Sequence, residues 1–245
     1  MAEYDTIRSA GVGARAQIDE GLRAHMNKVY GLMSVAMVVT AGVAWSVGSS
    51  EQLFSLLRNP ATGGMTILGW IAMFLPLGMV FAFGALINRM SAAAAQLFFY
   101  AFAAAMGLSL AWIFQVFTGV SIAQTFLITA IAFAGLSLYG YVTKRDLSAM
   151  GTFLMMGLIG LLVAMVVNIF LASSALAFAI SVIGVLIFAG LTAYDTQNIK
   201  NTYIAHAQAM DQEWLGKAAI MGALNLYLDF INLFMFLLQF MGNRE

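Results

Sequence analysis

The sequence predicts an all-α polytopic membrane protein, a bundle of seven transmembrane helices with the last helix at its centre. Hydrophobic residues make up 62% of the chain and charged residues only 9%, whereas ordinary soluble domains carry about 25% charged residues. Apolar runs longer than about 18 residues recur, and each can cross a bilayer as a helix. The runs are apolar on every side, whereas the strands of a membrane β-barrel alternate apolar and polar residues.

Charged residues and short polar segments mark the limits of the predicted spans. The run between Arg89 and Lys144 is too long for one crossing of a hydrocarbon core of about 30 Å, so the polar segment QVFTGVSIAQ at 115–124 must break it. By the same reasoning, LASSA at 171–175 divides the run from 147 to 194. The predicted spans are 29–50, 65–88, 92–115, 122–142, 149–171, 175–197 and 218–241.

Residues 1–24 are predicted to form a cytoplasmic N-terminal tail, and residues 242–245 a short C-terminal tail. The first 28 residues mix both signs of charge, unlike a signal peptide, which has a basic start and then an apolar core. Lysines and arginines concentrate on the cytoplasmic side of membrane proteins, and only Arg58 and Arg244 fall on the outer side if the N-terminus is inside. The residues then on the inner side are Arg8, Arg15, Arg23, Lys28, Arg89, Lys144, Arg145, Lys200 and Lys217. We therefore expect the N-terminus inside; a re-entrant last segment after six spans would place the C-terminus inside as well.

Composition excludes several classes of function. The chain has no cysteine, so disulfides, thiolate metal sites and thiol chemistry are excluded. A net charge of zero argues against nucleic-acid binding. The only histidines are His25 and His206, without the spacing of a metal enzyme, and the GVGARA near the N-terminus lacks the strand that precedes a dinucleotide-binding loop. We expect no enzyme activity and no resident cofactor.

Two carboxylates stand out, because only Asp195 and Asp229 lie within predicted apolar segments. An aspartate at the centre of a bilayer costs roughly 2.5–3.5 kcal/mol on insertion scales. Successive antiparallel helices can bring the two to similar depth, and two close carboxyls cannot both ionise easily, so they exchange protons as a unit. The structural alternatives are a protonated Asp229 that packs as an amide would, and an Asp195 that pairs with Lys200 or caps a turn.

A polar stripe accompanies Asp229 on the last predicted span. Asn225, Asn232 and Gln239 lie four residues before it and three and ten residues after it, which places all four side chains near one face of a helix. Such a stripe is predicted to face the bundle interior rather than lipid, which makes this helix the central one. The alternative for the three amides is ordinary hydrogen bonding to neighbouring helices.

Arg89 and Tyr194 are further candidates. Arg89 ends the second span on the predicted inner side, where it would latch to one of the aspartates and close a pathway; the alternative is an anchor that snorkels to the surface. Tyr194 directly precedes Asp195 and would support the pair, although tyrosines at such positions are commonly packing residues. Small residues four apart, such as Ala103 and Gly107, predict close helix packing.

Two stretches carry a family resemblance. AYDTQNIK at 193–200, followed by LNLYLDFINLFMFLL at 224–238, resembles the Bax inhibitor (TMBIM) family, and its bacterial members in particular. The resemblance covers residues 25 to 241. It implies a bacterial inner-membrane protein with a seven-helix bundle around a central last helix and a pH-dependent calcium leak. It also implies that Asp195 and Asp229 form a proton-sensing pair to which Arg89 can latch.

The resulting hypothesis is a calcium leak gated by the two aspartates, with the bilayer, calcium ions and protons as partners. Calcium prefers six to eight oxygen ligands, so Asp195 and Asp229, with help from Asn225 and Asn232, would bind it weakly and in passing, which suits conduction. The alternative is a non-conducting client or modulator of a membrane-bound protease. A remote alternative is an intramembrane aspartyl protease, but the second aspartate follows LYL rather than the GxG typical of that class.

Overall fold

The computed structural model describes residues 2–209 and 211–243, and side chains from residue 18 onward. The described residues form helices and no strand. Seven of these helices are long and apolar enough to cross a membrane, which confirms the predicted class, an all-α polytopic membrane protein. The elements are α1 (Ala2–Gly48), α2 (Glu51–Ser55), α3 (Ile67–Leu86), α4 (Ala92–Leu110), the 3-10 helix η1 (Ala111–Gln115), α5 (Gly119–Val142), α6 (Ser148–Leu171), α7 (Ser174–His206) and α8 (Gln212–Met241).

Serine and threonine residues set where several spans begin. The hydroxyls of Thr66, Ser91, Thr118 and Ser173 accept a hydrogen bond from a backbone N–H in the first turn of α3, α4, α5 and α7. Such N-caps satisfy N–H groups that have no partner within the helix. Two of them, Thr118 and Ser173, lie in the polar segments that the sequence analysis predicts as breaks, which explains why the chain turns there.

The helices extend beyond some of the expected limits. Helix α1 begins at Ala2, so helical backbone covers most of the region expected as the tail 1–24. Helix α7 continues to His206 and α8 begins at Gln212, so both run past the spans 175–197 and 218–241. Lysine and arginine mark the limits of apolar runs, but they are good helix formers, and a helix therefore continues through them into the interface.

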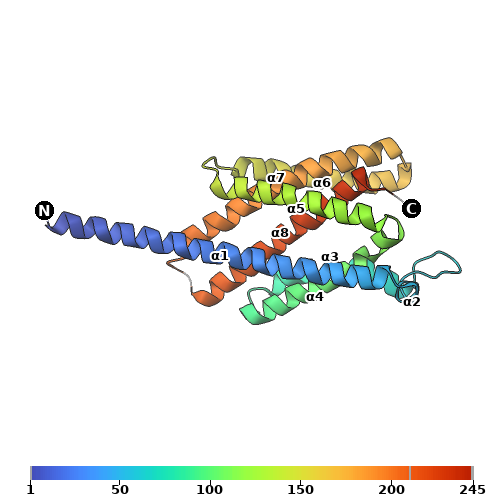
Figure 1. Ribbon diagram of the computed structural model, residues 1–245, viewed down its shortest axis with the longest axis horizontal. Helices are drawn as coiled ribbons and strands as arrows, with labels where there is room; N and C mark the ends of the chain where they lie inside the picture. Colours follow the sequence, from blue (N-terminus) through green and yellow to red (C-terminus); the bar gives the residue numbers. More distant parts are fainter. Residues whose placement is uncertain (1, 210, 244–245) are drawn as a thin grey trace.

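Two three-helix lobes are joined by the last helix (Figure 1). Helix α4 packs against α1 and α3, and helix α7 packs against α5 and α6, while α8 contacts α1 and α4 of one lobe and α5 and α7 of the other. Two-thirds of the most apolar stretch of α8 is buried, against 11–44% for the other six spans. The last helix is therefore central, as predicted.

Close helix contacts hold the first lobe together at the small residues that the sequence indicates. Thr40 of α1 donates a hydrogen bond of 2.8 Å to the carbonyl oxygen of Ala103 on α4. A Cβ on Gly107, one turn further along α4, would come within 2.7 Å of both the carbonyl oxygen of Thr40 and Cβ of Val43. Only glycine permits this approach of the two backbones.

Candidate functional site

The two aspartates meet at the contact between α7 and α8. Asp229 is only 4% exposed, and Asp195 is half-buried. Their carboxyl groups lie close enough to interact directly across this contact. The helices α7 and α8 are antiparallel neighbours, so the structure brings together the two residues that the sequence analysis singles out.

The chemistry of this pair depends on one proton. Carboxylates only accept hydrogen bonds, so two of them can bond to each other only when one carries a proton. Oδ2 of Asp229 is buried and receives no hydrogen bond from any donor among the described residues. A buried carboxylate oxygen without a donor is costly, so a proton shared with Asp195, or a cation, is what can compensate its charge.

The four side chains from Tyr194 to Gln197 each contact a different neighbouring part of the structure. Tyr194 lies against Gly151 of α6, where a Cβ would overlap its ring, whereas Asp195 faces α8. Thr196 lies 2.9 Å from the hydroxyl of Ser137 on α5. Gln197 donates to the carbonyl oxygen of Arg145 at 2.7 Å and accepts from the N–H of Leu147 at 2.8 Å, which fixes the loop between α5 and α6. This segment therefore holds α7 in place as well as supplying one carboxyl.

A chain of hydroxyls crosses three helices beside the pair. The hydroxyl of Thr196 donates to the carbonyl oxygen of Thr192 at 2.8 Å, so its single proton is used. Ser137 must therefore donate to Thr196 at 2.9 Å, and Tyr30 of α1 to Ser137 at 2.6 Å. Sequence reasoning missed this chain, because single hydroxyls in apolar helices give no signal in composition.

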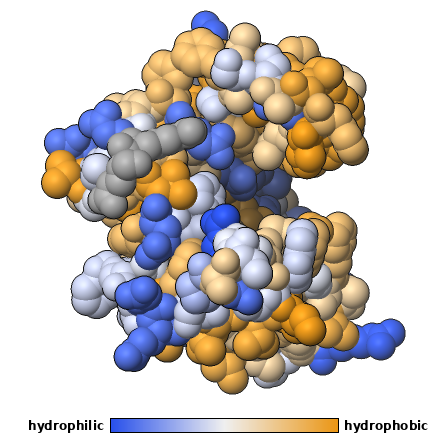
Figure 2. Space-filling view, turned by 90° about the vertical axis from the view of Figure 1, so that its right-hand side faces the viewer, coloured by the Kyte–Doolittle hydropathy of each residue, from blue (hydrophilic) through white to orange (hydrophobic). Residues whose placement is uncertain are grey.

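The predicted polar stripe lies along one side of α8 that is only partly covered. Asn225 and Asn232 are half-buried and Gln239 is exposed. Asn232 donates to the carbonyl oxygen of Leu228 in its own helix, and Oε1 of Gln239 lies 3.5 Å from the hydroxyl of Ser181 on α7. The stripe is thus buried at Asp229 and partly covered at Asn225 and Asn232, and Asn225 lines a pocket. Figure 2 shows a hollow between the two lobes with hydrophilic residues inside it.

The end of the bundle that carries Arg89, Lys144, Arg145, Lys200 and Lys217 is called here the basic end. A pocket of about 290 Å³ opens there and reaches from His25, Asn88 and Asn198 to Lys217 and Asn225. Asn225 lies one helical turn from Asp229, so this pocket comes within one turn of the aspartates, although neither of them lines it. It contains amides and a lysine, and no carboxylate among its lining residues.

Arg89 and Tyr194 lie apart from the pair. Arg89 stands in the turn after α3 with an exposed side chain and forms no ion pair with a described residue, so a latch to either aspartate would require movement of this turn. Tyr194 belongs to the apolar contact between α6 and α7. The described residues contain no group of three or more His, Cys, Asp or Glu that could hold a metal ion, and two carboxyls alone offer calcium few of its ligands.

Seven apolar spans with a carboxyl pair between the last two define an integral, multi-pass membrane protein. The family model described as "Inhibitor of apoptosis-promoting Bax1" matches residues 22–245. The chain therefore belongs to the Bax inhibitor family, as the two motifs indicate.

Bacterial relatives match along most of their length. The chain is 46% identical over 225 residues to the inner membrane protein YbhL of Escherichia coli, covering 92% of this chain and 94% of the relative. It is 46% identical over 227 residues to a Rickettsia prowazekii protein, covering 93% and 92%. A Caulobacter vibrioides protein is 43% identical over 236 residues, covering 95% and 94%.

Proposed function

We propose that this protein is a pH-sensitive leak for calcium across the bacterial inner membrane, with Asp195 and Asp229 as its proton sensor. The observation that carries the proposal is that the two carboxyls lie close enough to interact between α7 and α8. The inner-membrane location is supported by the similarity to a protein described as an inner membrane protein.

The carboxyl pair couples protonation to charge and to helix packing. With a proton between them, Asp195 and Asp229 bond to each other and join α7 to α8. When that proton leaves, two negative charges face each other across the same contact, and they repel each other and attract a cation. The carboxyl oxygens of Asp195 and Asp229 therefore bind either a shared proton or a calcium ion.

The surroundings suit a passing ion. Asn225 and Asn232 supply amide oxygens along the partly covered side of α8, close to Asp229. Amide and carboxylate oxygens are the ligands calcium prefers, and a site with few fixed ligands releases the ion again, as conduction requires. The protein acts in this proposal without enzymatic chemistry and without a resident cofactor.

The proposed orientation places the basic end in the cytoplasm. Arg89, Lys144, Arg145, Lys200 and Lys217 gather at this end, whereas Arg58 is the one described lysine or arginine at the opposite end. Because positive residues are retained on the cytoplasmic side, α1 enters the membrane from the cytoplasm. The pocket beside Asn225 then lies at the cytoplasmic end.

The test is calcium influx into liposomes that contain the purified protein and a calcium indicator, measured at pH 6, 7 and 8. We expect a pH-dependent flux that Asp195→Asn or Asp229→Asn abolishes or makes independent of pH. Asp146→Asn is the matched control. Hydrogen bonds from the side chain and backbone of Ser148 lower the pKa of the exposed Asp146, so its carboxylate does not titrate in this range.

Absence of flux above empty liposomes, from protein shown to be folded, would overturn the leak. Retention of the full pH dependence in both aspartate variants would overturn the sensor. In the first case the role would move to that of a client or modulator of a membrane-bound protease. Such a role predicts that the aspartate variants still bind the protease.

A further inference from the structure

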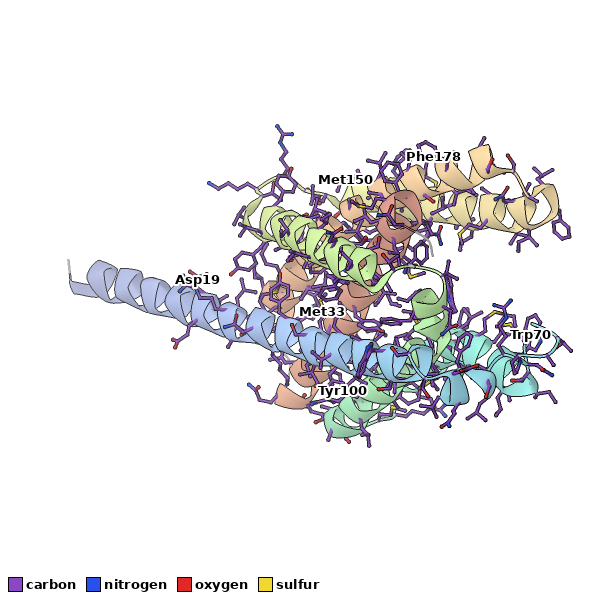
Figure 3. All side chains as sticks on the ribbon, turned by 45° about the vertical axis from the view of Figure 1, so that its right-hand side comes forward. Asp19, Met33, Trp70, Tyr100, Met150 and Phe178 are labelled. Atoms are coloured by element: carbon purple, nitrogen blue, oxygen red, sulfur yellow. The ribbon has the colours of Figure 1, made fainter. Side chains whose placement is uncertain are left out.

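A second cavity opens on the other side of α8, between α1 and α5. It has a volume of about 800 Å³, and Phe230 of α8 lies at its floor. We call it the lateral groove. Figure 1 shows α1 and α5 on the same side of the molecule with α8 passing behind them, and in Figure 3 Met33 lies on the side of α1 toward α5.

The lateral groove changes from polar to apolar along its length. At the basic end, Arg23, Asn27 and Tyr141 line it. The hydrogen bond of 2.6 Å between Tyr30 and Ser137 crosses it next. Beyond this bond, apart from Ser34, the lining residues are apolar: Met33, Met37, Val38, Ala41, Phe126, Ala130, Phe133 and Ala134. A ligand with a polar head and an apolar chain matches this change from a polar to an apolar lining.

The lateral groove is longer than one leaflet of the membrane is thick. Its residues on α1 run from Arg23 to Ala41, which corresponds to roughly 27 Å at 1.5 Å per residue. The hydrocarbon core is about 30 Å thick, so the groove starts at one interface and passes the midplane. Its rim residues Val38 and Leu138 are 72% and 61% exposed. Because these apolar side chains face the surrounding membrane, access is from the lipid phase.

Charge selects the head group. Arg23 has an exposed side chain, and Nζ of Lys200 lies 5.8 Å from the ring of Tyr141 while donating to its carbonyl oxygen. No aspartate or glutamate is among the described residues that line the groove. Guanidinium and ammonium groups without a carboxylate partner attract phosphate.

We propose that the lateral groove binds one anionic phospholipid from the leaflet at the basic end. Its phosphate lies beside Arg23, and one acyl chain follows the apolar part between α1 and α5 as far as Ala41. The lipid fills the space that the two lobes leave open above Phe230. This site is separate from the aspartates and does not depend on the proposed leak.

Native mass spectrometry of the detergent-purified chain, titrated with phosphatidylglycerol or phosphatidylethanolamine of the same acyl chains, tests the proposal. We expect one phosphatidylglycerol to bind several-fold more tightly than phosphatidylethanolamine. Arg23→Gln should weaken phosphatidylglycerol binding about tenfold, the loss of one charged hydrogen bond. Arg23→Lys should retain most of the preference, and Arg58→Gln at the opposite end should leave it unchanged.

A second pair of variants tests the acyl part. Ala134→Trp places a large ring in the groove and should weaken binding of both lipids, whereas Ala123→Trp, on an exposed part of α5 outside the groove, should not. Equal affinity for both lipids in the wild type would overturn the proposal. So would an Arg58→Gln effect as large as that of Arg23→Gln. A dimer that Ala134→Trp dissociates, with lipid binding unchanged, would assign the groove to a second copy instead.

Discussion

The hydroxyl of Tyr227 donates a hydrogen bond of 2.7 Å to Oγ1 of Thr40, within the buried contact between α8 and α1. The direction is fixed, because Thr40 uses its own proton on the carbonyl oxygen of Ala103. Phe99 and Phe102 of α4 approach the Tyr227 ring edge-on, with centroids 5.7 and 5.8 Å away. This arrangement joins the central helix to the first lobe.

Removal of either hydroxyl should destabilise the bundle, and Thr40→Val more than Tyr227→Phe. Tyr227→Phe removes one neutral hydrogen bond, worth about 1 kcal/mol. Thr40→Val removes two and leaves the buried Tyr227 hydroxyl without a partner, which costs about 1–3 kcal/mol more. Thermal unfolding in detergent measures both. Tyr139→Phe, at an exposed position on α5, is the control, and equal midpoints for all three variants would contradict the assignment.

Glycine at position 140 should be required where α5 meets α7. A Cβ there would overlap the backbone of Ala193, and backbone cannot move aside as a flexible side chain can. Gly140→Ala should therefore lower the unfolding temperature, even though alanine favours a helix by about 1 kcal/mol over glycine. Gly135→Ala, on the same helix with open space around it, should leave the temperature unchanged or raise it. A gain in both variants would show that the helices separate more easily than this contact indicates.

Gln197 should control the mobility of the loop at 143–147. Its side chain accepts from Leu147 and donates to Arg145, and each such bond is worth about 1 kcal/mol. In Gln197→Ala, amide hydrogen exchange of this loop should accelerate about tenfold or more. Asn201→Ala, an exposed position one turn further along α7, provides the comparison. Unchanged exchange in both variants would mean that other contacts hold the loop.

Arg89 should restrict the proposed leak. If its guanidinium latches to the aspartates in a closed state, Arg89→Gln removes an ion pair from that state alone and should raise calcium influx in liposomes. The exposed Arg58 at the opposite end is the matched control, and Arg58→Gln should behave as the wild type does. Equal influx in all three proteins would reduce Arg89 to an interfacial anchor.

Much of this fold follows from the sequence, because apolar length and capping residues are local properties. The breaks at 115–124 and 171–175 coincide with Thr118 and Ser173, whose hydroxyls cap the next helix. The central position of α8 follows from Asp229, since a carboxylate that far into a span needs protein around it. The pairing of Asp195 with Asp229 follows from their positions on successive antiparallel helices.

The division into lobes could not be predicted in this way. A helix that is apolar on every side shows no preferred face, so its hydrophobic pattern does not indicate which of α1, α3, α4, α5, α6 and α7 are neighbours. The bond between Tyr30 and Ser137 joins residues far apart in the chain. Only the assembled structure shows that a pocket opens between the lobes on the side of α8 that carries Asn225.

The two openings lie on opposite faces of one helix, because Phe230 and Asn225 are separated by about 140° around α8 at 3.6 residues per turn. Each opening lies between the lobes, one at α1 and α5 and the other near Asn88 and Asn198. Helix α8 therefore lies on the axis about which the two lobes can rotate relative to each other. A rigid rotation of one lobe about α8 widens one opening and narrows the other. A ligand that widens the lateral groove would then narrow the pocket beside Asn225.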